Sequence, residues 1–275
     1  MDFLLKNYSE KWNLMNPVLI AETGAGRIYK VMHKGRPLVL KVLTSLGKKE
    51  EGRTGALALK YFNGQGSVEL LRGDNGALLL SYVDGRSLKD LVLEGQDRQA
   101  SEIICKVLEK LHAVSALDRK IPAGLITMEE KFDLLFTSAK VEGDSLVREA
   151  AFLARHLLKT QERRAVLHGD IHHSNILESS TRGWVAIDAK GLVGDPTYDF
   201  ANVFYNPDDQ PWLVEEEERI LWLCALFSER FGVDPKRILE FAFVYGVLSA
   251  CWAVEDGLDP TRRRRIAGMI QKILN

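Results

Sequence analysis

The sequence predicts an α+β protein of two unequal parts: a small part rich in strands, followed by a larger part that is mostly helical. Two observations predict this arrangement. The first eighty or so residues contain short apolar runs separated by turns, which is typical of strands. After Asp84-Gly85, apolar residues recur at helical spacing over most of the remaining chain. We place the boundary between residues 83 and 84, so that 1–83 and 84–275 form separate units.

The first part is expected to contain one helix among several strands. Apolar or alternating runs predict strands over residues 18–21, 28–31, 38–43, 68–71 and 77–83. Gly73-Asp74-Asn75-Gly76 predicts a hairpin turn between the last two. Helical periodicity over residues 50–62 stops at Asn63-Gly64, a pair that commonly ends helices.

The second part begins with a capping box at Ser87-Leu88-Lys89-Asp90, which predicts the start of a helix. Later helices are expected at the long apolar stripe around residues 103–111 and near 129–141, 145–160, 215–231, 236–254 and 260–274. The segment 165–200 is irregular. Within it, short apolar runs at 165–167 and 184–187 predict strands.

The net charge excludes some classes of partner. The 275-residue chain has a formal net charge of −1, so no excess of positive charge favours nucleic acid or an anionic membrane. The four arginines at 262–265 are interpreted as the solvated face of the last helix. We therefore expect neither nucleic acid nor a membrane as partner.

Cysteine usage and apolar stretches predict a cytoplasmic protein, which we expect to be a monomer. Cys105, Cys224 and Cys251 are scattered in apolar surroundings, without the spacing of a disulfide framework or a zinc site. The first twelve residues lack the basic start and apolar block of a signal peptide. The most apolar stretch, residues 241–254, is too short to span a bilayer and is interpreted as a buried core helix.

The densest group of reactive side chains is His-Gly-Asp-Ile-His-His-Ser-Asn at residues 168–175, followed by Ile187-Asp188. Phosphoryl transfer needs a carboxylate that orients the attacking hydroxyl, oxygen ligands for Mg²⁺, and a cation near the nucleotide phosphates. Asp170 can be the carboxylate, and Asn175 and Asp188 can be the ligands. Lys41, on the strand after the first glycine turn, can be the cation. The set therefore contains the residue types that phosphoryl transfer from a nucleotide with Mg²⁺ requires.

The spacing His168-x-Asp170-x-x-x-x-Asn175 resembles the catalytic loop of protein kinases and, more closely, that of aminoglycoside phosphotransferases. Residues 186–196, Ala-Ile-Asp-Ala-Lys-Gly-Leu-Val-Gly-Asp-Pro, resemble one branch in particular, the streptomycin 6-phosphotransferase and hydroxyurea-resistance kinases. Residues 17–21, 63–66 and 245–250 match as well, so the resemblance spans nearly the whole chain. It implies a bilobal protein-kinase-like fold, with 1–83 as the nucleotide-binding N-lobe and 84–275 as the C-lobe that holds the catalytic loop and the acceptor site.

The resemblance also implies roles for individual residues. Asp170 would be the catalytic base, Asn175 and Asp188 would bind Mg²⁺, and Lys41 would contact the α- and β-phosphates. Asp199 would brace the catalytic loop from a following helix, and His168 would tie that loop to neighbouring backbone.

Three further nucleotide contacts follow from the same resemblance. The backbone from Ser81 to Val83 would bond the adenine edge. The turn that contains Gly24 and Gly26 would cover the phosphates, although Thr-Gly-Ala-Gly-Arg at 23–27 lacks the full Gly-x-Gly-x-x-Gly pattern. A glutamate should pair with Lys41. Glu50 and Glu51 both lie near its expected place, and we choose Glu51.

The acceptor implied by the resemblance is streptomycin or a related aminoglycoside, whose phosphorylation would inactivate the antibiotic. Hydroxyurea, a sugar or another small metabolite is the alternative with the same chemistry. A cationic acceptor favours an acidic pocket in the helical part. The candidates for that pocket are Asp195, Asp208, Asp209, the 215–218 run and Glu255-Asp256. The 215–218 run counts for little because a charge run is usually a solvated face, and Glu255-Asp256 is slightly better because it follows the family-like stretch 249–252.

Two alternatives belong to other classes of protein. A non-catalytic nucleotide-binding protein is disfavoured because Asp170, Asn175, Asp188 and Lys41 are all present. A metal hydrolase using the 168–173 cluster would need a second histidine-rich segment, and the remaining histidines are isolated. Among these, His112 is interpreted as a core histidine with a satisfied hydrogen bond.

Overall fold

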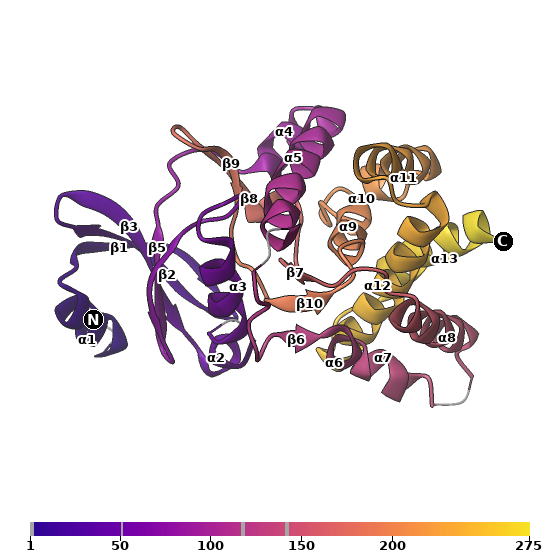
Figure 1. Ribbon diagram of the computed structural model, residues 1–275, viewed down its shortest axis with the longest axis horizontal. Coiled ribbons are helices and arrows are strands. Elements are labelled where there is room, and N and C mark those ends of the chain that lie inside the picture. The colour runs from indigo at the N-terminus through magenta and orange to yellow at the C-terminus, as the bar shows by residue number, and fades with distance from the viewer. Residues whose placement is uncertain (1–2, 51, 117–118, 141–142) are drawn as a thin grey trace.

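The computed structural model describes residues 3–50, 52–116, 119–140 and 143–275. An antiparallel sheet near the N-terminus adjoins a larger, mostly helical part (Figure 1). The sheet has the order β1-β2-β3-β5-β4, with strands β1 (Met15–Thr23), β2 (Gly26–His33), β3 (Arg36–Leu43), β4 (Leu70–Asp74) and β5 (Ala77–Ser81). The predicted α+β class is confirmed. The boundary at 83/84 stays a prediction.

The two faces of the sheet pack against different layers, because side chains alternate between the faces of a strand. On β3, Leu40 and Val42 pack with α1 (Phe3–Trp12), a helix that the sequence analysis did not predict. Leu43 belongs instead to the core cluster shared with the helical part. Lys41 is on the same face as Leu43, so the alternation directs this buried side chain away from α1 and towards the helical part.

The helix predicted over residues 50–62 is two helices, α2 (Ser45–Glu50) and α3 (Thr54–Phe62). The prediction was wrong at its start because Gly52 lies in a turn, where its amide donates to the Gly47 carbonyl at 2.9 Å. Glycine disfavours the interior of a helix because it has more backbone freedom to lose than other residues. The predicted end is confirmed, since Asn63 caps α3 in the left-handed conformation.

The helical part contains two small sheets. Its helices are α4 (Leu88–Leu93), α5 (Asp97–Ala116), α6 (Met128–Lys131), α7 (Asp133–Ser138), α8 (Ser145–Lys159), α9 (Tyr198–Ala201), α10 (Pro211–Val214), α11 (Glu217–Phe231), α12 (Pro235–Glu255) and α13 (Thr261–Leu274). The strands β6 (Ile126–Thr127), β10 (Leu192–Gly194) and β7 (Ala165–Leu167) form one sheet, and β8 (Ile176–Ser179) and β9 (Gly183–Ala186) form a hairpin. Of these strands, the sequence analysis missed β6, β8 and β10.

Helix α12 is the centre of the helical part and packs against α8, α9, α11 and α13. By length and hydropathy it is the one helix, within the described ranges, that could cross a membrane. However, 67% of its most apolar window is buried inside the protein. Its apolar character is explained by its place in the core, as the sequence analysis expected.

The end of β9 and the segment that follows it form hydrogen bonds with two parts of the N-terminal region. The Val68 amide donates to the Ala186 carbonyl at 2.9 Å, and the Ala186 amide donates to the Gly66 carbonyl at 2.8 Å. At the start of α3, the Thr54 hydroxyl donates to the Lys190 carbonyl at 2.7 Å. These bonds fix the segment that contains Asp188 against the sheet part.

We expect Gly191→Ala to destabilise this junction strongly. Gly191 has a φ of +75°, and a Cβ there would lie 2.0 Å from the Thr54 carbonyl oxygen. The substitution should lower the free energy of unfolding by about 3 kcal/mol in urea titrations. Gly183→Ala is the matched control, because Gly183 has a φ of +68° with no atom near the added Cβ. Its expected cost is about 1 kcal/mol, and equal losses would contradict a role for the junction.

Candidate active site

Asp199, on α9, holds the start of the 168–175 segment. Its carboxylate accepts hydrogen bonds from the His168 amide at 3.1 Å and from the Gly169 amide at 2.8 Å. Its Oδ2 also lies 3.1 Å from Nε2 of His112 on α5. The predicted bracing by Asp199 is confirmed, and so is the interpretation of His112 as a core histidine with a satisfied bond.

His168 is a structural residue, as predicted. Its Nε2 lies 2.8 Å from the Ile187 carbonyl, and its Nδ1 accepts from the Asp170 amide at 3.3 Å. These contacts fit a neutral ring that donates at Nε2 and accepts at Nδ1. Burial lowers the pKa of His168, although the nearby carboxylates of Asp199 and Asp170 act in the opposite direction. The ring therefore links the segment before Asp170 to the segment before Asp188.

Two asparagine side chains orient the Asp170 carboxylate. The Asn202 amide group donates to Oδ1 of Asp170 at 2.9 Å, and the Asn175 amide group lies 3.3 Å from Oδ2. Asn202 is held in turn by the side chain of Asn206, which donates to its Oδ1 at 2.7 Å. The sequence analysis missed Asn202. The available signal was a single amide residue inside the apolar run Tyr-Asp-Phe-Ala-Asn-Val-Phe-Tyr at 198–205.

Lys41 and Asp188, which are far apart in the sequence, are in direct contact. The Lys41 ammonium lies 2.6 Å from Oδ1 of Asp188. Burial opposes ionisation of Asp188, but the charge and the hydrogen bond of Lys41, together with the charge of Lys190 and a smaller effect of His168, outweigh it, and the pKa of the carboxyl group is lowered. Asp188 also has a φ of +60°, an uncommon conformation for a residue other than glycine that often marks a functional site.

Asn175 and Asp188 are adjacent because the Ile187 amide donates to the Asn175 carbonyl at 2.8 Å. The amide nitrogen of Asn175 also bonds the Asp170 carbonyl at 3.0 Å, which leaves its side-chain oxygen for other ligands. Carboxylate and amide oxygens suit Mg²⁺, which usually keeps few protein ligands and completes its shell with phosphates and water. The described residues contain no group of three or more His, Cys, Asp or Glu side chains placed to hold a metal, so the hydrolase alternative has no ligand set.

A mostly apolar cavity of about 200 Å³ lies beside Lys41 and Asp188. Ser81 and Val83 line it, as expected for the strand that leads out of the sheet. Within the described ranges, no protein oxygen accepts a hydrogen bond from the Val83 amide, which is therefore available to a ligand.

The remaining predicted nucleotide contacts are not brought to this cavity. Gly24 and Gly26 do not line it, and the Ala25 carbonyl between them accepts a hydrogen bond from the Thr44 amide at 3.0 Å. Ile20 and Ile28 of the same hairpin line the cavity instead. Glu51 lies outside the described residues.

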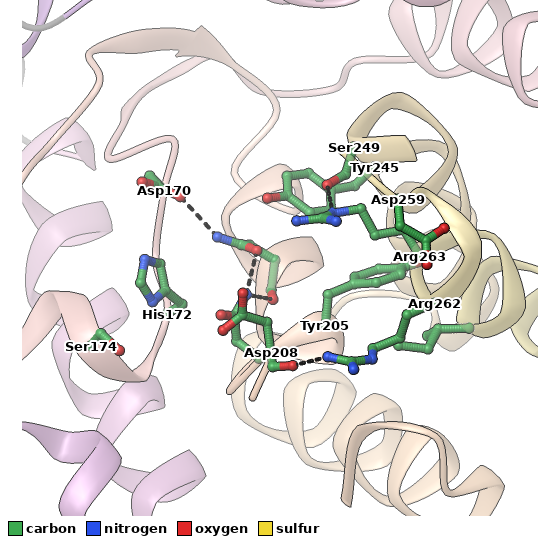
Figure 2. Close-up of a pocket in the computed structure, with 13 residues that line it drawn as sticks. Asp170, His172, Ser174, Tyr205, Asp208, Tyr245, Ser249, Asp259, Arg262 and Arg263 are labelled. Atoms are coloured by element: carbon green, nitrogen blue, oxygen red, sulfur yellow. Dashed lines mark hydrogen bonds between the residues drawn. The ribbon is translucent and has the colours of Figure 1, made fainter. Parts of the chain in front are cut away.

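Two polar cavities meet at Asp170 and Tyr245. The first, of about 420 Å³, lies between the catalytic segment and α13, and we name it the arginine cavity because Arg262 and Arg263 line it. Figure 2 shows Asp170 and His172 on one side of it and these arginines on the other. The second, of about 520 Å³, is lined by Glu255 and Asp256 as well as by Lys131 and Lys190, and we name it the acidic cavity because with Asp170 its carboxylates outnumber its lysines.

The fold itself is shared with solved structures of small-molecule kinases. A thermostable mutant of aminoglycoside phosphotransferase APH(4)-Ia matches with a TM-score of 0.64 at 16% identity, over 97% of this chain and 98% of that one. Choline kinase LicA from Streptococcus pneumoniae matches with a TM-score of 0.65 at 16% identity, over 98% of this chain and 99% of that one. These likenesses confirm the predicted bilobal protein-kinase-like fold.

Sequence comparison defines the family within this fold. The model of the aminoglycoside/hydroxyurea antibiotic resistance kinase family matches residues 11–257. A streptomycin 3″-kinase from Klebsiella pneumoniae is 32% identical over 253 residues, 90% of this chain and 91% of that protein. A hydroxyurea phosphotransferase from Kitasatospora aureofaciens is 29% identical over 255 residues, 86% of this chain and 71% of that protein. The chain belongs to this family of small-molecule kinases, which confirms the resemblance seen in the sequence.

Proposed function

We propose that this protein transfers the γ-phosphate of ATP, with Mg²⁺, to a hydroxyl group of streptomycin or a related aminoglycoside. The position of Asp170 carries the proposal. Both polar cavities open on this residue, and Asn175 links it to the segment that contains Asp188, the ion-pair partner of Lys41. A hydroxyl bound in either cavity can therefore approach a triphosphate held by Lys41. The similarity to a streptomycin 3″-kinase supports the choice of acceptor.

In this proposal Asp170 orients the acceptor hydroxyl and accepts its proton. The bonds from Asn202 and Asn175 fix the direction of the carboxylate before the acceptor arrives. A carboxylate suffices for this role, because the loose transition state of phosphoryl transfer requires proton removal only late. Most of the rate enhancement then comes from positioning and from neutralisation of phosphate charge.

Asn175 and Asp188 would hold Mg²⁺ through their side-chain oxygens. Bound there, Mg²⁺ would neutralise charge on the phosphate oxygens. Lys41 lies in contact with Asp188, so its ammonium is placed for the α- and β-phosphates of the same nucleotide. The adenine ring would occupy the apolar cavity, where the Val83 amide can donate to the ring edge. The apolar side chains of Ile20 and Ile28 would cover its faces.

The acidic cavity supports a cationic acceptor. Two lysines, Lys131 and Lys190, line this cavity. Glu255 and Asp256, at the end of α12, line it together with Asp170 and Trp252, so carboxylates are in the majority. Both carboxylates are exposed, so they can attract a cation without a large desolvation cost. This placement favours the pair that the sequence analysis preferred. Asp195, another candidate, is buried in an ion pair with Arg237 and does not line either cavity at Asp170.

We expect the double variant Glu255→Gln/Asp256→Asn to raise KM for streptomycin about tenfold, because each exposed charge contributes up to about 1 kcal/mol. KM for ATP should stay within about twofold of the wild-type value. Initial rates at varied streptomycin concentration and low salt would measure this effect. The control Glu217→Gln/Glu218→Gln removes the same charge from α11, away from both cavities, and should leave both constants unchanged. An equal rise of KM in the control would exclude a specific role for the acidic cavity.

An acceptor screen tests the proposed function itself. ADP release by the purified protein would be coupled to NADH oxidation, with ATP, Mg²⁺ and one acceptor at a time. Streptomycin or another aminoglycoside should stimulate release many-fold over the rate without acceptor. Stimulation by hydroxyurea or a simple sugar, without stimulation by any aminoglycoside, would support the same phosphotransfer reaction with a different acceptor. Tight ATP binding without turnover of any acceptor would favour the non-catalytic alternative.

A further inference from the structure

The four arginines at 262–265 do not share one environment. Arg264 forms an ion pair with Asp144 at 2.7 Å, and Arg265 pairs with Glu215 at 2.5 Å. Arg262 lies 3.6 Å from Glu215 and also donates to the Asp208 carbonyl. The interpretation of this run as a solvated face is confirmed for Arg262 and Arg265, which are exposed, and wrong for Arg263 and Arg264, which are half-buried where α13 packs along the helical part.

Arg263 differs from its three neighbours. Its Nε donates to the Ser249 hydroxyl at 3.0 Å, and no carboxylate in the described part of the chain lies within 4.0 Å of it. The side chain is half-buried and lines the arginine cavity. In Figure 2 it extends from α13 towards the side of the cavity that carries Asp170. A guanidinium has five N–H donors, so Arg263 has donors left for a ligand.

The other charges around the cavity restrict what that ligand can be. The carboxylates of Asp170, Asp208 and Asp259 also line it, and they disfavour a fully anionic group. Arg262 and Arg263 disfavour a cation at the opposite wall. A neutral unit rich in oxygen acceptors satisfies both constraints, since a hydroxyl, ether or carbonyl oxygen can accept from the guanidinium. The volume of about 420 Å³ is within the usual range of small-molecule pockets.

We propose that Arg263 is a specificity-determining residue that binds a neutral, oxygen-rich unit of the acceptor, such as a sugar ring. The cationic unit of the same acceptor would occupy the acidic cavity on the other side of Tyr245, which lines both cavities as Asp170 does. Arg263 would then select acceptors in which the reacting hydroxyl lies between a charged unit and a neutral unit. The inference rests on the proposed function and deepens it by assigning the two units of the acceptor to two cavities.

The test compares streptomycin with streptidine, its cationic aminocyclitol, which carries both guanidino groups but no sugar. In Arg263→Met, which keeps the apolar stem and removes the donors, KM and Kd for streptomycin should rise about tenfold or more. Kd for streptidine and KM for ATP should change less than about threefold, because neither ligand needs Arg263. Arg263→Lys should recover part of the loss. Binding is measured by calorimetry, and turnover by ADP release.

Arg264→Met is the matched control, because Arg264 is on the same helix, pairs with Asp144 and lines neither cavity. It should leave streptomycin binding unchanged. Unchanged streptomycin constants in Arg263→Met, or an equal loss for streptidine, would overturn the inference. Failure of the proposed function gives a different result. If the wild type binds streptomycin through Arg263 without turnover, the function fails and the inference stands. If the wild type does not bind streptomycin, both fail.

Discussion

Asp170→Ala is expected to lower kcat about 10²- to 10⁴-fold while ATP affinity stays within about threefold of the wild-type value. The reason is that Asp170 faces the acceptor cavities, whereas we assign nucleotide binding to Lys41 and Asp188. Its two bonds, from Asn202 and Asn175, come from side chains that the substitution leaves in place. Single-turnover rates and calorimetric Kd values for ATP–Mg²⁺ would separate the chemical step from binding.

Asp208→Ala provides the comparison, because Asp208 lines the same cavity but bonds Arg262 only through its backbone carbonyl. It should change kcat less than about fivefold. An Asp170→Ala variant that turned over streptomycin within tenfold of the wild-type rate would show that Asp170 does not have the assigned role.

Asp188→Ala is expected to reduce both turnover and nucleotide binding. The substitution removes a proposed Mg²⁺ ligand and the carboxylate 2.6 Å from the Lys41 ammonium. We expect kcat to fall more than about 10³-fold and Kd for ATP–Mg²⁺ to rise at least about tenfold. Because Lys41 is 2% exposed, loss of a paired carboxylate should also lower the free energy of unfolding by about 3 kcal/mol.

A magnesium titration shows whether substitution of Asp188 acts through a weakened metal site. If the metal site is weakened, half-maximal activity should need a higher Mg²⁺ concentration in Asp188→Asn, which retains one oxygen donor, than in the wild type. Asp170→Ala should show the wild-type Mg²⁺ dependence for its residual activity. The assignment of Asp188 to the metal would be refuted by an Asp188→Ala variant with an unchanged Kd for ATP–Mg²⁺.

The parts of the site that could be predicted from sequence are those set by local spacing. Asp170 and Asn175 lie five positions apart, so one short segment brings them together. The alternation of side chains along a strand places Lys41 on the face opposite α1. A resemblance over nearly the whole chain then connected Lys41 with Asp188, two residues 147 positions apart.

The parts that could not be predicted depend on contacts between distant segments. Asn202 reaches Asp170 only because α9 packs beneath the catalytic segment, and its sequence neighbours are those of an ordinary core helix. Arg263 is one of four consecutive arginines, and a charge run by itself indicates a solvated face. Its different role depends on the orientation of α13 about its own axis, which places Arg263 beside Ser249 on α12.

The glycine turn illustrates a further limit of the sequence. The spacing of Gly24 and Gly26 before a lysine-bearing strand favoured a phosphate loop, but that spacing also suits a tight hairpin. In the structure, a Cβ on Gly26 would lie 2.5 Å from the Val42 carbonyl oxygen, so the close approach of β3 is a sufficient reason for glycine there. Its contact with phosphate stays a prediction.

A crystal structure with a non-hydrolysable ATP analogue and Mn²⁺ in place of Mg²⁺ tests the central claim most directly, because anomalous scattering locates the metal. We predict a Mn²⁺ peak within bonding distance of the side-chain oxygens of Asn175 and Asp188, with the Lys41 ammonium on the α- and β-phosphates and the γ-phosphate directed at Asp170. A metal and triphosphate bound elsewhere, with Asn175 and Asp188 outside the coordination shell, would contradict the account.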